Sequence, residues 1–154
     1  MLCGAVYIRY RHLGSINGLL KTLHQEAELN RHGAEGWELV SISSINGQKG
    51  QFGQCNYAAA KAGMHGFTMS LAQETARKGV TVNTVSPGYV ATSMVMAIAE
   101  DIRNKLIAQI PVGRLGEPEE IAWAVSFLAD EKSGFVTGMN LAINGGKILI
   151  LLFS

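Results

Sequence analysis

The chain has 154 residues, of which 47% are hydrophobic and 16% are charged, and its formal net charge at pH 7 is +1. This length supports one domain with a hydrophobic core, and this composition argues against a disordered chain. A small net charge without a basic cluster argues against a nucleic-acid-binding surface.

The cysteines, histidines and apolar tail of the chain argue against a disulfide framework, a metal site and a membrane span. Two cysteines, Cys3 and Cys55, are too few for a disulfide framework, so we expect a reducing, cytoplasmic compartment. The four histidines do not have the spacing of metal ligands, and we expect no metal site. The apolar tail, residues 147–154, is far shorter than the roughly 20 residues that span a bilayer. We expect it to be an edge strand or an aggregation-prone segment, and not a membrane span.

The first third of the chain predicts a strand, a helix and a second strand. Residues 3–10 are typical of a strand, residues 17–31 of a helix that Gly33 ends, and residues 37–43 of another strand. A strand, helix and strand in this order predict a parallel crossover unit.

The middle of the chain continues the alternation. A glycine-rich loop precedes a long helix, 57–78, which Gly79 closes, and a strand follows at 80–85 and ends in Ser86-Pro87-Gly88.

Two more helical regions and a strand follow. Residues 92–110 predict an irregular helix with a methionine-rich apolar face. Pro118 predicts the start of a helix that runs to about residue 130, and 137–144 is typical of a last strand.

The alternation of strands and helices predicts an α/β fold, with a mostly parallel sheet covered on both faces. Ligands of such sheets bind at the carboxyl ends of the strands. Ser44, Pro87-Gly88 and Asn144-Gly145 all follow predicted strands, so we expect them at one edge of the sheet.

The candidate catalytic residues are Ser44, Tyr57 and Lys61. Tyr57 and Lys61 lie four residues apart on a predicted helix, so they share one face. A neighbouring cation makes a phenol a better proton donor at neutral pH, and a serine hydroxyl can orient the same carbonyl oxygen. A tyrosine and a lysine at this spacing arise by chance in roughly one such chain in five. The alternative is a half-buried tyrosine beside a solvated lysine.

From about residue 39 to residue 146, the sequence resembles the C-terminal half of a short-chain dehydrogenase/reductase. Within that family it is most similar to acetoacetyl-CoA reductases and 3-oxoacyl-ACP reductases. The segments that carry the resemblance are 42–54, 56–63, 80–89 and 138–146.

The resemblance implies reduction of a 3-oxoacyl-CoA or acyl-ACP with NADPH, in polyhydroxyalkanoate or fatty-acid synthesis. NADH remains an alternative cofactor, because the residues that discriminate the two lie in the N-terminal half of complete family members. It implies that Tyr57 donates the proton, that Lys61 supports Tyr57 and binds the nicotinamide ribose, and that Ser44 orients the ketone. It also implies a homo-oligomer formed through helix 57–78 and the last strand. The residues expected to cradle the nicotinamide are Pro87, Gly88, Val90 and Thr92, and those expected to line the acyl pocket are Gln51, Phe52, Gln54 and Tyr89.

The resemblance also reveals a gap at the N-terminus. Complete family members begin with a strand, a T-G-x-x-x-G-x-G turn and a helix that bind the pyrophosphate, and this chain has no such motif. We therefore expect a partial Rossmann-like, doubly wound parallel sheet without the N-terminal dinucleotide-binding strands.

The first 36 residues are atypical for the family. Residues 33–40 resemble a bacterial domain with a G-A-E-G-W-E-L-V hallmark, which suggests a fusion, a rearranged gene or a fragment. The expected division is therefore 1–36, 37–146 and the tail 147–154. Asn17 lies 27 residues before Ser44, near the position of the family's catalytic asparagine, and is a further candidate.

Three functions remain open from the sequence. The chain is an active reductase, a non-catalytic remnant, or a module that docks onto complete relatives. Cofactor binding by the isolated chain distinguishes the first from the other two.

Overall fold

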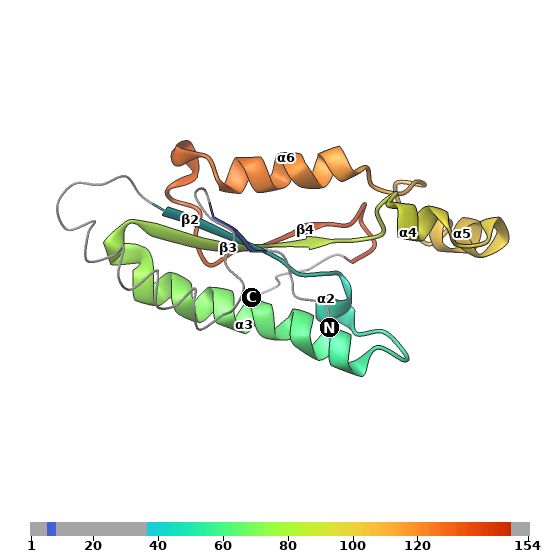
Figure 1. Cartoon of the computed structure of the whole chain (residues 1–154), viewed down its shortest axis with the longest axis horizontal. Coiled ribbons are helices and arrows are strands. Elements are labelled where there is room, and N and C mark those ends of the chain that lie inside the picture. The colour runs from blue at the N-terminus through green and yellow to red at the C-terminus, as the bar shows by residue number, and fades with distance from the viewer. Residues whose placement is uncertain (1–5, 9–36, 149–154) are drawn as a thin grey trace.

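The computed structural model describes residues 6–8 and 37–148. A sheet with the strand order β1-β2-β3-β4 lies between two helical layers, with helix α3 on one face and helix α6 on the other (Figure 1). The strands are β1 (Val6–Ile8), β2 (Trp37–Ile42), β3 (Val80–Pro87) and β4 (Asn140–Ile143). The helices are α2 (Asn46–Lys49), α3 (Cys55–Thr75), α4 (Ser93–Met96), α5 (Glu100–Ile107) and α6 (Pro118–Leu128), with 3-10 turns at Ala76–Lys78 and Glu131–Ser133.

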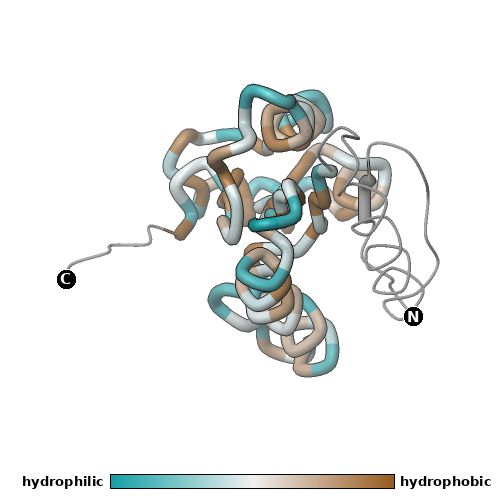
Figure 2. Tube along the Cα trace, turned by 90° about the vertical axis from the view of Figure 1, so that its left-hand side faces the viewer, coloured by the Kyte–Doolittle hydropathy of each residue, from teal (hydrophilic) through white to brown (hydrophobic). Residues whose placement is uncertain are grey.

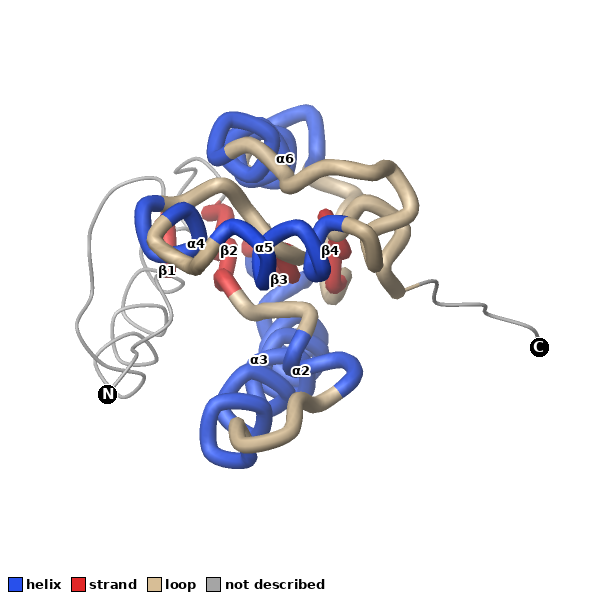
Figure 3. Tube along the Cα trace, turned by 90° about the vertical axis from the view of Figure 1, so that its right-hand side faces the viewer, coloured by secondary structure: helices blue, strands red, loops and turns tan. Residues whose placement is uncertain are grey.

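The central part of the sheet confirms the predicted parallel arrangement. Strand β3 pairs in parallel with β2 on one side and with β4 on the other. Because all three strands run the same way, their carboxyl ends meet at one edge. Helices α4 and α5 lie beyond that edge, in front of the sheet in Figure 3.

The predicted parallel crossover from the first strand to β2 is wrong. Strand β1 pairs antiparallel with β2, with Val6 opposite Ser41 and Ile8 opposite Leu39. Periodicity predicts a strand but not its direction, because side chains alternate identically along both directions of a chain. The helix predicted at 17–31 and most of the apolar tail lie outside the described residues.

The long helix is confirmed. Helix α3 starts two residues before Tyr57, and it continues through a 3-10 turn to Gly79, whose φ of 73° provides the left-handed C-cap. The predicted region 92–110 divides into α4 and α5, and the glycine-rich loop contains the short helix α2, which was not predicted.

The last strand is shorter than the predicted range 137–144. Val82 N donates to the side chain of Thr137, at 3.0 Å, and Gly138 N donates to Val82 O, at 2.7 Å. A threonine hydroxyl therefore replaces a backbone partner of β3 there, and regular pairing begins only at Asn140.

Two hydrophobic clusters hold the layers together. Under α3, the buried residues are Leu39, Leu71, Ala72, Val80 and Val82; under α6, they are Val40, Val85 and Leu128. Successive residues of β2 and β3 point to opposite faces, so both strands are buried on both sides. Figure 2 shows hydrophobic and hydrophilic residues alternating around the helices above and below the sheet.

Candidate active site

Ser44 lies immediately beyond the carboxyl end of β2. After Ile42 the chain stays beside β3, because Ser43 N donates to Val85 O at 2.8 Å and Ile45 N donates to Pro87 O at 2.9 Å. The Ser44 side chain is buried, and its Oγ accepts a hydrogen bond from Asn46 N at 3.1 Å. Because Oγ is the acceptor in this contact, the contact does not use the hydroxyl hydrogen of Ser44.

The turn that carries Ser44 packs tightly against α3. A Cβ atom on Gly47 would lie 2.8 Å from the backbone carbon of Lys61, which is closer than real Cβ contacts. Ser43 Oγ donates to Lys61 O, at 2.8 Å. Glycine at position 47 therefore lets the turn after β2 approach the helix at Lys61.

Lys61 lies beside Tyr57, as their spacing predicts. The Lys61 Nζ atom is 5.6 Å from the centroid of the Tyr57 ring, and it donates to Ile42 O at 2.8 Å. The lysine side chain is only 7% exposed, whereas Tyr57 is half-buried. The alternative of a solvated lysine is therefore excluded, because its ammonium is buried between the helix and the end of β2.

The carboxyl ends of β3 and β4 meet at the same edge, as predicted. Gly88 N donates to Ile143 O at 2.8 Å, and a Cβ atom on Gly88 would lie 2.8 Å from the Cα atom of Asn144. The turn Pro87-Gly88 thus lies against Asn144 on the β4 side of β3. The turn that carries Ser44 lies on the opposite, β2 side.

Val90 and Thr92 continue this edge toward α4. Val90 forms a parallel bridge with Gly116, and Thr92 is the N-cap of α4, where its hydroxyl accepts a long hydrogen bond from Val95 N at 3.4 Å. Both residues therefore have defined backbone positions next to Gly88.

The four candidates for the acyl pocket differ in their surroundings. The side chains of Gln51 and Gln54 are exposed and are held by Lys49 Nζ at 2.7 Å and by Asn46 Nδ2 at 2.8 Å, respectively. Phe52 is fully exposed. Tyr89 lines a cavity of about 140 Å³ whose other walls come from the loop before α6 and the end of β4, with Ile110, Val112, Arg114, Gly116, Glu120, Ile143, Asn144 and Gly145.

Two polar residues that sequence patterns did not single out lie within the fold, one buried and one half-buried. Asn83 is completely buried in β3; its Nδ2 donates to Val136 O at 2.7 Å, and its Oδ1 accepts from Met139 N at 3.1 Å. His65 lies one helical turn after Lys61, with Nε2 at 3.2 Å from Ser86 Oγ, and burial lowers the pKa of its imidazole. The sequence signal for Asn83 is a polar residue inside an apolar strand. Such a residue is expected to be hydrogen-bonded, because buried polar groups need partners.

Residues 6–8 and 37–148 contain neither a cluster of metal ligands nor a membrane-spanning helix. Across these residues no three side chains of His, Cys, Asp or Glu cluster as metal ligands would. None of the helices in the same residues is long and apolar enough to cross a bilayer. Asn17 lies outside the described part of the chain.

Comparison with known proteins identifies related reductases. A family model described as "Enoyl-(Acyl carrier protein) reductase" matches residues 12–147, so the match begins within the atypical segment 1–36. The acetoacetyl-CoA reductase of Cupriavidus necator is 65% identical over 112 residues, which cover 72% of this chain and 46% of the relative. The acetoacetyl-CoA reductase of Allochromatium vinosum is 63% identical over 111 residues, which cover 72% and 45%.

A more distant relative aligns over more of the chain. The 3-oxoacyl-[acyl-carrier-protein] reductase FabG of Escherichia coli is 44% identical over 139 residues, which cover 90% of this chain and 55% of the relative. The chain therefore spans about half the length of the curated relatives it matches. Together with the partial Rossmann-like sheet, these matches show that the chain belongs to the short-chain dehydrogenase/reductase family.

Proposed function

We propose that this chain carries the catalytic half of an NADPH-dependent reductase of 3-oxoacyl thioesters, with acetoacetyl-CoA as the first substrate to test. The observation that carries the proposal is the burial of Lys61 between Ile42 O and the ring of Tyr57, with Ser44 in the adjoining turn. Burying an ammonium is costly, and such clusters of titratable groups mark functional sites.

In the proposed reaction, a bound reduced nicotinamide supplies the hydride that converts the keto carbon into an alcohol carbon. Tyr57 donates its phenolic proton to the ketone oxygen, and the resulting phenolate is stabilised by the Lys61 ammonium. Ser44 donates its hydroxyl hydrogen to the same oxygen and orients it. The products are a 3-hydroxyacyl thioester and the oxidised nucleotide.

The residues present fit the nicotinamide end of such a cofactor. Hydroxyl donors and a buried ammonium lie at the carboxyl ends of the strands, and Gly88 follows β3 at the same edge. Pro87, Gly88, Val90 and Thr92 would contact the carboxamide, and Lys61 the ribose hydroxyls. This sequence contains no glycine-rich turn of the kind that holds the adenosine phosphates in complete family members, and Asn17 remains a candidate for the catalytic asparagine.

The substrate class is proposed from the names of the relatives and the loop between β2 and α3. Two acetoacetyl-CoA reductases are 63% and 65% identical to the matched part of the chain. In the proposal, Gln51, Phe52 and Gln54 contact the acyl chain from one side and Tyr89 from the other. An exposed Phe52 gives this loop an apolar group for such a contact.

A second candidate function is a non-catalytic half that docks onto a complete relative, or onto another copy, through α3 and β4. The observation that favours it is an exposed, small-residue stretch of α3. Helix α3 exposes small residues, Ala59, Ala60, Ala62 and Gly63, that permit close packing of another helix.

The test is a titration of the chain with NADPH, followed by measurement of NADPH oxidation on addition of acetoacetyl-CoA. Binding and turnover support the reductase. Binding without turnover would place the missing function in the substrate contacts or in Asn17. Absence of binding at millimolar NADPH, together with co-purification with a complete reductase, would replace the reductase with the docking function.

A further inference from the structure

One glycine, Gly116, holds the backbone that follows β3. Gly116 N donates to Tyr89 O at 2.9 Å, and Ala91 N donates to Gly116 O at 2.8 Å. Val90 lies between these two bonds and forms a parallel bridge with Gly116. The position of the backbone from Tyr89 to Ala91 therefore depends on where Gly116 lies.

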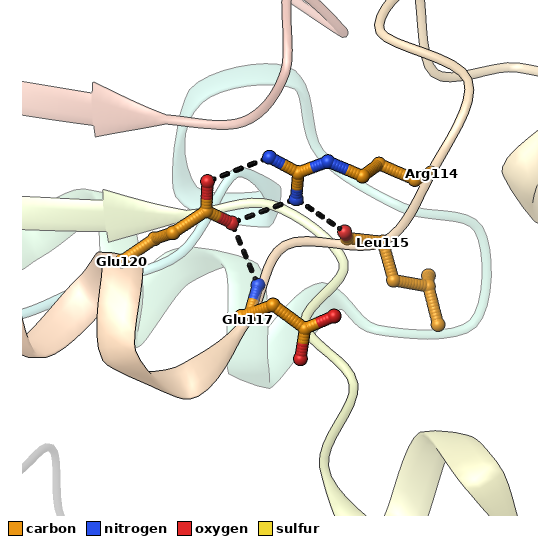
Figure 4. Close-up of polar contacts among 4 residues, drawn as sticks. All are labelled: Arg114, Leu115, Glu117 and Glu120. Atoms are coloured by element: carbon orange, nitrogen blue, oxygen red, sulfur yellow. Dashed lines mark hydrogen bonds and ion pairs between the residues drawn. The ribbon is translucent and has the colours of Figure 1, made fainter.

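The carboxylate of Glu120 fixes the residues on both sides of Gly116 (Figure 4). Arg114 donates from Nη1 to Oε2 at 2.8 Å and from Nη2 to Oε1 at 2.7 Å. Glu117 N donates to the same Oε2, also at 2.8 Å. Arg114 Nη1 also donates to Leu115 O, at 2.9 Å. The three hydrogen bonds to Glu120 fasten the loop to the first turn of α6, and the fourth holds the guanidinium against the loop itself.

The ion pair supplies geometry more than stability. Its side chains are 55% and 44% exposed, and exposed ion pairs contribute little to the free energy of folding. A planar guanidinium that donates two parallel bonds nevertheless fixes both the distance and the orientation of its partner. The hydrogen bond from Arg114, followed by that from Glu117 N, lowers the pKa of Glu120 to about 2, so the carboxylate stays charged at physiological pH.

The loop that this ion pair holds, residues 111–117, lies where the carboxyl ends of the central strands meet. It forms a wall of the cavity that Tyr89 and Asn144 also line. Val112 N donates to Gly145 O at 3.2 Å, so the loop is also tied to the turn after β4. The segment with α4 and α5 leaves the sheet after Ala91 and returns at Ile110. Both of its ends are therefore held by the loop that Arg114 and Glu120 fasten.

We propose that Arg114 and Glu120 are positioning residues: their ion pair sets the position of Gly116 and, through Gly116, that of the Tyr89–Ala91 backbone next to the proposed nicotinamide site. Neither side chain needs to touch the cofactor or the substrate. Their role in cofactor binding rests on the proposed function, whereas the clamp itself can be measured without any cofactor.

The first test measures amide hydrogen exchange by NMR on the full chain. The variants are Arg114→Gln, Glu120→Gln and the double variant, and the matched control is Glu119→Gln, which removes the same charge from the same turn of α6. We expect exchange at Gly116 and Ala91 to become roughly tenfold faster in all three clamp variants. We expect Val82 and Val85 in β3 to keep their protection, and the control to resemble the wild type.

Two further results sharpen this test. Amide exchange in the double variant should be no faster than in either single variant, because each single variant already breaks the same pair. Arg114→Lys should restore only part of the protection, because an ammonium keeps the charge but not the two parallel bonds. Unchanged exchange at Gly116 and Ala91 would overturn the proposal. An equal loss of protection throughout β3 would also overturn it, because it would indicate a purely structural role.

The second test measures the Kd for NADPH. Arg114→Gln and Glu120→Gln should raise Kd by about the same factor as the exchange rates, and Glu119→Gln should not. If the wild type does not bind NADPH, the proposed function fails for the isolated chain, while the exchange experiment still decides the clamp. If the wild type binds and the variants lose protection without losing affinity, the positioning role is refuted although the reductase stands.

Discussion

The two faces of the sheet are built differently. The face under α6 is apolar toward the carboxyl ends of β2 and β3, with Val40, Val85 and Leu128 completely buried. Toward the amino ends the same face carries the buried polar residues Glu38, Thr81 and Asn83. The face under α3 is apolar only near the amino ends of the strands. Toward their carboxyl ends it becomes polar, and the contacts there are the pairs Thr68 with Thr84, His65 with Ser86, Ser43 with Lys61, and Lys61 with Ile42.

The difference separates stability from placement. Apolar packing contributes most of the free energy of folding but tolerates small shifts. Buried hydrogen bonds fix orientation, because an unmatched polar group is costly. Tyr57 stands on the polar half of α3, one turn before Lys61, so the proposed proton donor is carried by the face that fixes orientation most strictly.

The largest effect is expected on turnover, from substitution of Tyr57 at the polar end of α3. Tyr57→Phe should reduce turnover of acetoacetyl-CoA by roughly 10²–10⁴, because the proton donor is lost. Its thermal unfolding should stay close to that of the wild type, since Tyr57 is only half-buried. Steady-state kinetics and a melting curve measure the two quantities. Full turnover in this variant would remove Tyr57 from the mechanism.

Substitutions in the cluster under α6 should change the free energy of unfolding and not the chemical step. Leu128→Ala should lower the free energy of unfolding by about 2–5 kcal/mol, because it leaves a cavity beside Val40 and Val85. Trp123→Ala, on the exposed side of the same helix, is the control and should cost much less. Urea denaturation followed by circular dichroism measures both. Equal losses in the two variants would contradict the assignment of the buried face.

The hydrogen bond between the hydroxyls of Thr68 and Thr84 tests whether the polar contacts under α3 are energetically coupled. Thr84→Val should cost about 1–3 kcal/mol, because it leaves the buried hydroxyl of Thr68 without its partner. The double variant with Thr68→Val should regain part of this loss, because both polar groups are then absent. A double-mutant cycle from urea denaturation gives the coupling, and strict additivity would show that the pair is energetically independent.

The smallest effect is expected from the titration of His65. Burial lowers its pKa in the folded state below the ordinary 6.5, so the unfolded state binds a proton first as pH falls. The contribution of His65 to stability is therefore complete above pH 6.5 and decreases as pH falls below that value. His65→Gln should lose part of the difference in unfolding free energy between pH 7.5 and pH 5.5. An unchanged difference would mean that other groups account for it.

Local patterns in the sequence predicted much of the sheet and of the site. Strands at β2 and β3, helices at α3 and α6, and the meeting of Ser44, Gly88 and Asn144 at one edge are all observed. Each depends on features within one segment, such as an apolar run, a glycine after a helix or an i,i+4 spacing. The order of strands and helices supplied the parallel arrangement.

The buried face of α3 could not be found in this way. Lys61, Thr68 and Thr75 face the sheet, whereas small and apolar residues such as Ala60 and Met69 are exposed. Apolar periodicity therefore does not mark the buried face of this helix. What decides it is the set of partners on β2 and β3, which are polar beside Lys61 and Thr68 and apolar beside Leu71 and Ala72. These partners are distant in sequence.

By itself, the sequence determined the family, the parallel core and the pairing of Tyr57 with Lys61, because these depend on residue types at short spacings. Only the tertiary structure decided the antiparallel direction of β1, the burial of the Lys61 ammonium against Ile42, and the clamp of Arg114 and Glu120 around Gly116. These features depend on which backbone groups meet across the fold, and no local pattern encodes that meeting.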